Sequence, residues 1–134
     1  MTVNNRIHPR VKAHFPAEVT AGDGVKLEVF LENISINGLM IVASQYDFET
    51  ILVNSRGLQL NQPVEADLKF SLHNKDKPAN GDIQVRCRAV YVRRQSQNKY
   101  FIGFKFLKIS QHNQQLVTSY VNDNLGPGEE TIAC

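Results

Sequence analysis

The sequence predicts an all-β protein, in which a small antiparallel barrel is followed by a short C-terminal α-helix. Apolar and polar residues alternate through most of the 134-residue chain, and this is the period of a strand with one buried face. Helical spacing of apolar residues occurs near the C-terminus. Several short strands separated by turn residues favour a sandwich or a barrel. We favour the barrel because closure removes exposed strand edges.

Length and composition indicate one domain. The 134 residues match the size of a single domain, and a hydrophobic content of 42% is enough for one core. A net charge of +2 is unlike that of a protein that coats long nucleic acid. We expect Cys87 and Cys134 to be free thiols in a reducing compartment. The absence of a secretory signal and of a membrane-length apolar run predicts a cytoplasmic protein without membrane insertion.

The first half of the chain predicts three strands. In residues 25–31, alternate positions are apolar, which indicates a half-buried strand. Residues 17–20 are expected to pair with this strand through the turn Gly22-Asp23-Gly24. Residues 39–42 follow the turn signal Asn37-Gly38 and predict the third strand.

The second half predicts three more strands. Residues 64–72 form the clearest strand of the chain, with apolar residues at every even position. Residues 83–91 and 100–106 alternate in the same way, with a turn at residues 96–98 between them. These two strands are therefore expected to form a long hairpin.

Two segments depart from the strand pattern. After Ser110, a plausible N-cap, apolar residues recur at helical spacing and predict a helix that packs one face on the sheet; they are Leu116, Val117, Tyr120 and Val121. Gly126-Pro-Gly128 is expected to stop this helix. Residues 44–62 are weakly patterned and predict a loop with a short irregular helix or strand.

The first candidate binding group precedes the first predicted strand, in Arg6-Ile-His-Pro-Arg10. Proline disfavours the helical conformation of His8, so the segment is expected to be extended or turned. In an extended segment both guanidinium groups lie on one side, roughly 13 Å apart at about 3.3 Å per residue. They could hold two ends of one ligand, and the alternative is a solvated basic tail.

The second candidate group is Asn33-Ile-Ser-Ile-Asn-Gly38. A spacing of two places the Asn33 amide and the Ser35 hydroxyl on the same side of a strand. Gly38 supplies a position where the backbone can take positive φ or a ligand can approach the N–H closely. The alternative interpretation is an ordinary hairpin turn, since Asn-Gly is a strong turn signal.

Taken together, the two groups resemble the signature of the PilZ domain family, whose members bind cyclic di-GMP. The resemblance lies in Arg-x-x-x-Arg, a hairpin of some twenty residues, and then Asn-x-Ser-x-x-Gly. Residues 85–92 and 100–106 look like the penultimate and last strands of the family. The resemblance implies a six- to seven-stranded antiparallel β-barrel with a short C-terminal α-helix over residues 17–125. Residues 1–16 would then be a flexible arginine-bearing segment, and residues 126–134 a frayed tail.

The resemblance also implies a bacterial second-messenger receptor whose ligand is cyclic di-GMP, without another cofactor. Its site residues would be Arg6, Arg10, Asn33, Ser35 and Gly38. An arginine fork matches the O6 and N7 acceptors of guanine, and the amide and hydroxyl would bind a guanine edge or a phosphate. Ligand binding would order the arginine segment and present a surface to a downstream protein partner. Asn5 stands where members with a stacked ligand pair have arginine, which implies one nucleotide per chain.

Four further arginine and aromatic residues have two interpretations each. Arg86, Arg88 and Arg94 share one parity and could extend a basic face toward the phosphates, although outward charges on a strand are usually solvated. Tyr91 stands where the family often has tryptophan and could stack on a base. Its parity matches that of Ala89, so we favour a core position.

Other functions fit the sequence less well. A protein-interaction adaptor on the same barrel, with weak or no nucleotide binding, is the main alternative. A single-stranded nucleic-acid binder would need outward aromatics among basic residues, so we expect no DNA or RNA binding. We expect no metal site, since the histidines are scattered, and no enzymatic activity, since no catalytic constellation can be placed. The histidines are His8, His14, His73 and His112.

Overall fold

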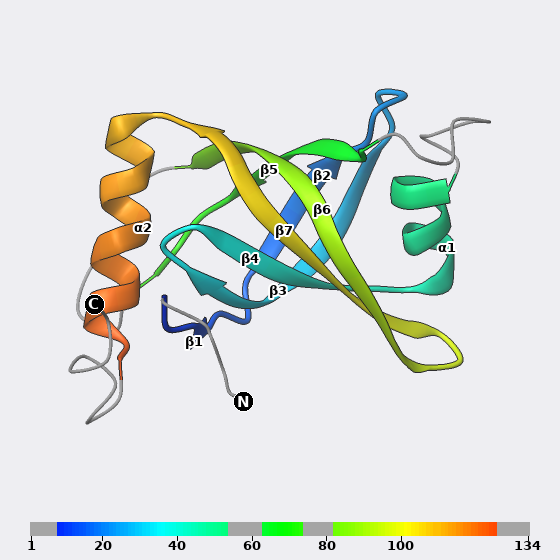
Figure 1. Cartoon of the computed structure of the whole chain (residues 1–134), viewed down its shortest axis with the longest axis horizontal. Helices are drawn as coiled ribbons and strands as arrows, with labels where there is room; N and C mark the ends of the chain where they lie inside the picture. The colour runs from blue at the N-terminus through cyan, green and yellow to red at the C-terminus, as the bar shows by residue number, and fades with distance from the viewer. Residues whose placement is uncertain (1–7, 54–62, 74–81, 126–134) are drawn as a thin grey trace.

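The computed structural model describes residues 8–53, 63–73 and 82–125, and shows seven strands and three helical segments within them (Figure 1). The strands are β1 (Val11–Lys12), β2 (Pro16–Thr20), β3 (Lys26–Ser35), β4 (Gly38–Ala43), β5 (Glu65–Phe70), β6 (Ile83–Ser96) and β7 (Lys99–Ile109). The helical segments are α1 (Gln45–Phe48), the π-helix η1 (Glu49–Val53) and α2 (Gln111–Asp123). None of these helices is long and apolar enough to cross a membrane.

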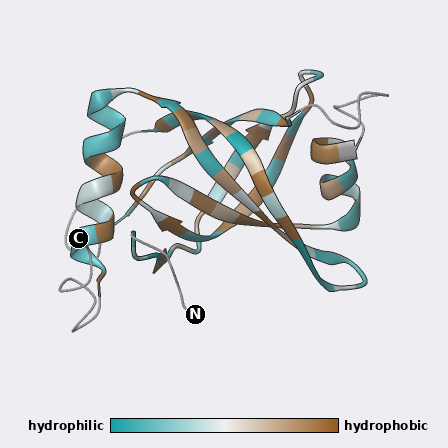
Figure 2. Cartoon of the chain, in the orientation of Figure 1, coloured by the Kyte–Doolittle hydropathy of each residue, from teal (hydrophilic) through white to brown (hydrophobic). Residues whose placement is uncertain are grey.

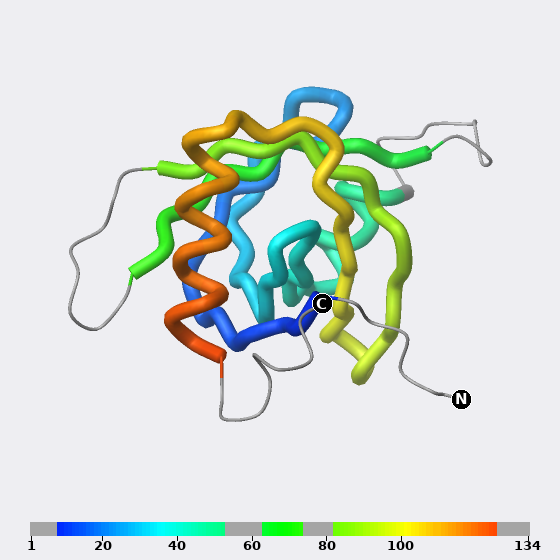
Figure 3. The backbone as a smooth tube through the Cα atoms, turned by 60° about the vertical axis from the view of Figure 1, so that its left-hand side comes forward, coloured from blue at the N-terminus to red at the C-terminus, as the bar shows by residue number. Residues whose placement is uncertain are grey.

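Six of the strands close into an antiparallel barrel in the order β3-β2-β5-β6-β7-β4, and β4 pairs back onto β3. The short strand β1 pairs with the second half of β3, outside this ring. Figure 3 shows the strands arranged around a common interior, with α2 in front. The predicted antiparallel barrel with a C-terminal helix is therefore confirmed.

Hydrophobic and hydrophilic residues alternate along the strands, as the colours of Figure 2 show. The hydrophobic side chains on the inner face of each strand fill this interior. The pattern predicted for residues 64–72 is confirmed, because all five apolar side chains at even positions are buried. Buried side chains of the other strands complete the core, including Val29, Leu31, Ile34, Leu39, Ile41, Ile102 and Phe104. Cys87 is part of this core, and burial raises the pKa of its thiol to about 12. It is a free thiol.

The helices lie at opposite ends of the barrel (Figure 1). The Ser110 hydroxyl accepts a hydrogen bond from the Asn113 N–H at 3.1 Å, which confirms the predicted N-cap of α2. Its buried residues are Val117, Tyr120 and Val121. The helix ends at the C-cap Asn124, before the predicted stop at residues 126–128, which lie outside the described residues.

Regular structure begins earlier than the first strand that the sequence predicts, with β1 outside the barrel ring. Val11 pairs with Ile34 and is buried, as is Ala13. The Tyr120 hydroxyl donates to the Lys12 carbonyl at 3.0 Å and thereby connects β1 to α2. The proposed flexibility of residues 1–16 stays a prediction, and residues 1–7 lie outside the described residues.

The weakly patterned segment from residue 44 contains a short helix. The sequence predicted either a short irregular helix or a strand here. The Ser44 hydroxyl accepts from the Asp47 N–H at 3.1 Å and caps α1. The chain then continues as η1, and the ring of Phe48 stacks on Tyr100 with centroids 4.3 Å apart. Residues 54–62 lie outside the described residues.

Candidate functional site

Arg10 and Asn33, one residue from each half of the predicted motif, are in direct contact. Arg10 Nη1 donates to Asn33 Oδ1 at 2.9 Å, across 23 positions of sequence. The contact follows from the pairing of β1, which places Lys12 opposite Asn33. Arg10 has the parity of Lys12 and therefore extends over the same outer face of β3. Arg6 lies outside the described residues.

Ser35 is buried and its hydroxyl is engaged within the β3–β4 turn. It donates to Asn37 Oδ1 at 2.7 Å, while the Gly38 carbonyl oxygen lies 3.3 Å away. The Asn37 N–H in turn donates to the Ser35 oxygen at 3.4 Å. Gln114 of α2 donates to the Ile36 carbonyl at 2.9 Å and holds the turn against the helix. The described contacts of Ser35 therefore stabilise the turn.

Gly38 does not have the backbone conformation that the sequence analysis allowed for it. Among the described residues, positive φ occurs only at Gly24, which excludes the first of the two reasons considered for a glycine at position 38. The turn centres on Ile36 and Asn37, and Gly38 is already the first residue of β4. A Cβ at Gly38 would collide with the Phe104 carbonyl oxygen. Glycine is needed here because β4 and β7 approach closely.

The sequence analysis missed Met40, which continues the site beyond Asn33. Asn33 Nδ2 donates to the Met40 sulfur at 3.8 Å, and the Tyr91 hydroxyl donates to the same sulfur at 3.6 Å. A thioether sulfur is a weak acceptor, so both contacts can be exchanged at little cost. Arg10, Asn33, Met40 and Tyr91 thus form a continuous line of side chains.

Tyr91 was predicted to lie in the core, and this was wrong because the residue is 38% exposed. Ala89 pairs with Phe104 and Tyr91 with Gly103, so the register shifts at Val90. One extra residue reverses the parity of the residues that follow, here as far as the next register shift after Arg94. The Tyr91 ring lies directly over Gly103, where a Cβ would collide with the ring carbons.

The register places these residues on one outer surface of β3, β4, β7 and β6, which we call the motif face. Residues directly opposite one another in antiparallel strands point to the same side. One row across the motif face consists of Asn33, Met40, Gly103 and Tyr91. The next row consists of Ser35, Gly38, Lys105 and Arg88. Two rows on one face are separated by two residues, roughly 7 Å along a strand.

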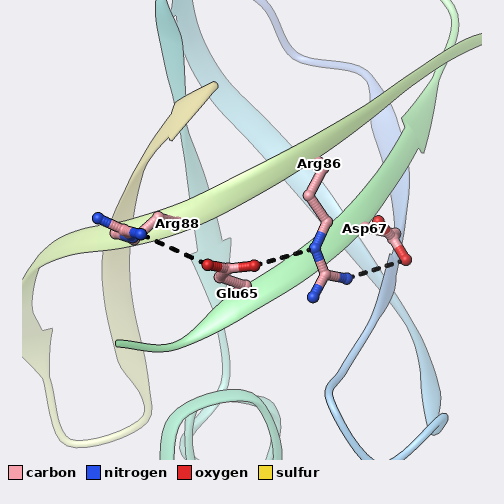
Figure 4. Close-up of polar contacts among 4 residues, drawn as sticks. All are labelled: Glu65, Asp67, Arg86 and Arg88. Atoms are coloured by element: carbon pink, nitrogen blue, oxygen red, sulfur yellow. Dashed lines mark hydrogen bonds and ion pairs between the residues drawn. The ribbon is translucent and has the colours of Figure 1, made fainter. Parts of the chain in front are cut away.

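Arg88 of this surface and the nearby Arg86 belong to a ladder of charges between β5 and β6 (Figure 4). Arg86 contacts Glu65 at 3.3 Å and Asp67 at 3.2 Å. Partial burial of Arg86 opposes its charge, but hydrogen bonds and charges from Asp67 and Glu65 outweigh this and raise its pKa. Arg88 contacts Glu65 at 3.5 Å.

The three arginines that shared a predicted basic face therefore differ in position. Arg88 lies in a row of the motif face, while Arg86 lies opposite Lys108, further along β7. Arg94 lies near the tip of the β6–β7 hairpin and donates to the carbonyls of Ser96 and Gln97 at 3.2 and 3.1 Å. In the described ranges, no cluster of three His, Cys, Asp or Glu side chains could hold a metal ion.

Comparisons with known proteins address the fold and the family. Solved structures with a similar fold include the Bacillus subtilis inhibitor of motility MotI/DgrA, with a TM-score of 0.66 and 15% identity over 90% of this chain and 51% of that one. The PilZ domain of Escherichia coli YcgR with c-di-GMP has a TM-score of 0.60 and 12% identity, over 90% of this chain and 92% of that one. The K. pneumonia MrkH–c-di-GMP complex has a TM-score of 0.63 and 16% identity, over 90% of this chain and 52% of that one.

These identities show a shared fold, and the chain spans about half the length of MotI/DgrA and MrkH. No curated protein matches the sequence. A family model, described as the PilZ domain, matches residues 4–123, which include every residue of the predicted motif. Because this match extends over most of the sequence, the chain belongs to the PilZ domain family.

Proposed function

We propose that the chain is a receptor for cyclic di-GMP, bound by Arg6, Arg10, Asn33, Ser35 and Gly38. The observation that carries the proposal is the 2.9 Å contact between Arg10 and Asn33, because it joins both halves of the motif on the motif face. The c-di-GMP complexes of the structurally similar YcgR and MrkH support the choice of ligand.

The chemistry of the contacts suits a guanine nucleotide. The Arg10 fork can donate two hydrogen bonds to guanine O6 and N7 and can stack on the purine plane. Asn33 has a second amide proton besides the one directed at Met40, and this proton can donate to a ligand acceptor. Ser35 can bind the ligand when its hydroxyl turns away from Asn37.

Tyr91 adds an aromatic surface to the proposed site. Tyr91 is 38% exposed and lies in the same row as Asn33. Every purine has a π-face, and stacking of a base on an aromatic ring contributes about 1–3 kcal/mol. We therefore include Tyr91 as the residue on which one guanine stacks.

Calorimetric titration with cyclic di-GMP tests the proposal, and we expect one nucleotide per chain because Asn5 provides no further guanidinium for a stacked pair. Cyclic di-AMP is the control, because adenine presents a donor where guanine presents O6. Two nucleotides per chain would contradict the inference from Asn5 and leave the receptor assignment intact. No binding would favour the interaction adaptor instead.

We further propose that the ligand orders the N-terminal arginine segment and thereby creates a surface for a protein partner. Val11 and Lys12 are already paired with β3, and the Arg10 side chain already contacts Asn33, so this ordering mainly concerns the residues before Arg10. A ligand that contacts both the segment and the barrel only in the closed state shifts the population toward that state. Ordering costs about 1–2 kcal/mol per residue in backbone entropy, which predicts micromolar rather than picomolar affinity.

Amide hydrogen exchange measures this ordering directly. Cyclic di-GMP should slow the exchange of residues 1–10, while the amides of β5, in the barrel wall, serve as an internal control. Protection of residues 1–10 that is already high without ligand, or that the ligand leaves unchanged, would contradict the ordering mechanism even if the nucleotide bound tightly.

A further inference from the structure

The charges of this chain are unevenly distributed along the sequence. Residues 83–122 carry seven Lys and Arg side chains and neither Asp nor Glu, so all 13 carboxylate side chains lie elsewhere. These residues include the strands β6 and β7 and most of α2. The small net charge of +2 therefore conceals a basic side of the barrel, formed by β6 and β7. A binding site for an anion can be sought among the seven cationic side chains of these strands.

Most of these cations already have a structural contact. Arg86 and Arg88 pair with carboxylates of β5, and Arg94 binds carbonyls of its own turn. Arg93 and Lys99 lie over the Phe101 ring at 4.9 and 5.6 Å from its centroid. Two lysines of β7 remain, Lys105 and Lys108, and both are exposed without an ion pair to any described carboxylate.

Register distinguishes these two lysines. Lys105 lies directly opposite Gly38 on one side and Arg88 on the other, in the second row of the motif face. Lys108 lies opposite Arg86, where Glu65 and Asp67 are already close. Lys105 is thus the cation on β7 that borders the predicted nucleotide motif.

We propose that Lys105, assisted by Arg88, forms a phosphate-binding subsite beside Gly38. This inference rests on the proposed function, in which Arg10 and Tyr91 bind the bases and the charge of the two phosphates remains to be neutralised. A lysine ammonium is a compact charge with three donors and binds phosphate without a fixed orientation. Its strand pairs with β4 and β6 on both sides, so the ammonium extends from a rigid part of the barrel.

Glu65 limits the contribution of Arg88 to phosphate binding. It is shared between Arg86 and Arg88, and its contact with Arg88 is the longest of the ladder at 3.5 Å (Figure 4). Arg86 keeps Asp67 when Glu65 is lost. Glu65 therefore restrains Arg88 and places a negative charge near the phosphates, so its neutralisation should strengthen binding.

Calorimetric titration of cyclic di-GMP into Lys105→Gln and Lys108→Gln tests the subsite. Lys105→Gln should weaken binding roughly three- to tenfold, between the effect of an exposed ion pair and that of a charge-assisted hydrogen bond. Its affinity should also fall less with added salt than that of the unmodified chain. Salt screens the contact between Lys105 and a phosphate, and the variant has no such contact to lose. Lys108→Gln should bind like the unmodified chain, and both variants should melt at its temperature.

Glu65→Gln should bind roughly two- to threefold more tightly, as expected for removal of one unit negative charge near the phosphates in water. Equal affinities and salt dependences for Lys105→Gln and Lys108→Gln would overturn the subsite and leave the receptor assignment standing. Weaker binding by Glu65→Gln would overturn the role of Arg88. Failure of the unmodified chain to bind the nucleotide would overturn the proposed function and the subsite with it.

Discussion

Replacement of Arg10 by alanine should weaken the binding of cyclic di-GMP at least about tenfold, since a hydrogen bond to a charged group contributes roughly 1.5–3 kcal/mol and 1.4 kcal/mol corresponds to one decade. The variant loses a guanidinium that lies 2.9 Å from Asn33 and extends over the motif face. Calorimetry at constant salt measures the change. Arg6→Ala should lose affinity to a similar extent if both arginines hold the ligand.

Folding should survive this substitution. Arg10 precedes β1, and the core residues of this segment, Val11 and Ala13, are unchanged. Arg10→Lys retains the charge without the planar fork. Its affinity for cyclic di-GMP should therefore lie between that of the unmodified chain and that of Arg10→Ala. Arg94→Ala, at the hairpin tip, is the matched arginine control and should bind normally. Normal affinity of Arg10→Ala, or a large drop in its melting temperature, would contradict the assigned role.

The parts of the fold that depend on local pattern could be predicted from the sequence. Alternation in residues 64–72 predicted β5 because a strand has a period of two, and Ser110 predicted the start of α2 because its hydroxyl can cap a helix. The two-residue spacing of Asn33 and Ser35 also placed both on one side of β3. These features can be predicted because each depends only on the local sequence that forms it.

The features that depend on pairing between distant strands could not be predicted in this way. The bulge at Val90 arises where β6 and β7 change register. The alternation of β6 ends there in four apolar residues, 89–92, but this does not show which of them face outward. Tyr91 was therefore assigned to the wrong face. Gly38 was interpreted as a turn residue because its reason for being glycine, the Phe104 carbonyl, lies on another strand.

The basic side of the barrel is a different case, because the sequence contained the necessary information. The net charge of +2 hides this clustering, and the outward charges of β3 and β5 alternate in sign, as in Lys26 and Glu28 or Asp67 and Lys69. The count over residues 83–122 shows that this alternation ends before β6. Only the register of β7 against β4, however, shows that Lys105 rather than Lys108 borders the motif.

Replacement of Gly103 by alanine should weaken binding roughly tenfold although position 103 need not touch the ligand, since base–aromatic stacking contributes about 1–3 kcal/mol. The new Cβ would occupy the space of the Tyr91 ring. Because this ring is a partly exposed side chain, it can swing away while the paired backbone of β7 stays in place. The aromatic surface beside Met40 would then be lost.

A double-mutant cycle separates this mechanism from general damage. Tyr91→Ala should weaken binding about as much as Gly103→Ala, and the double variant should be no weaker than Tyr91→Ala, because the glycine acts through the ring. Tyr91→Phe keeps the ring, loses only the weak contact with the Met40 sulfur, and should bind nearly normally. Additive losses in the double variant would mean that Gly103 acts independently of Tyr91. Normal binding by Tyr91→Ala would show that no base stacks there.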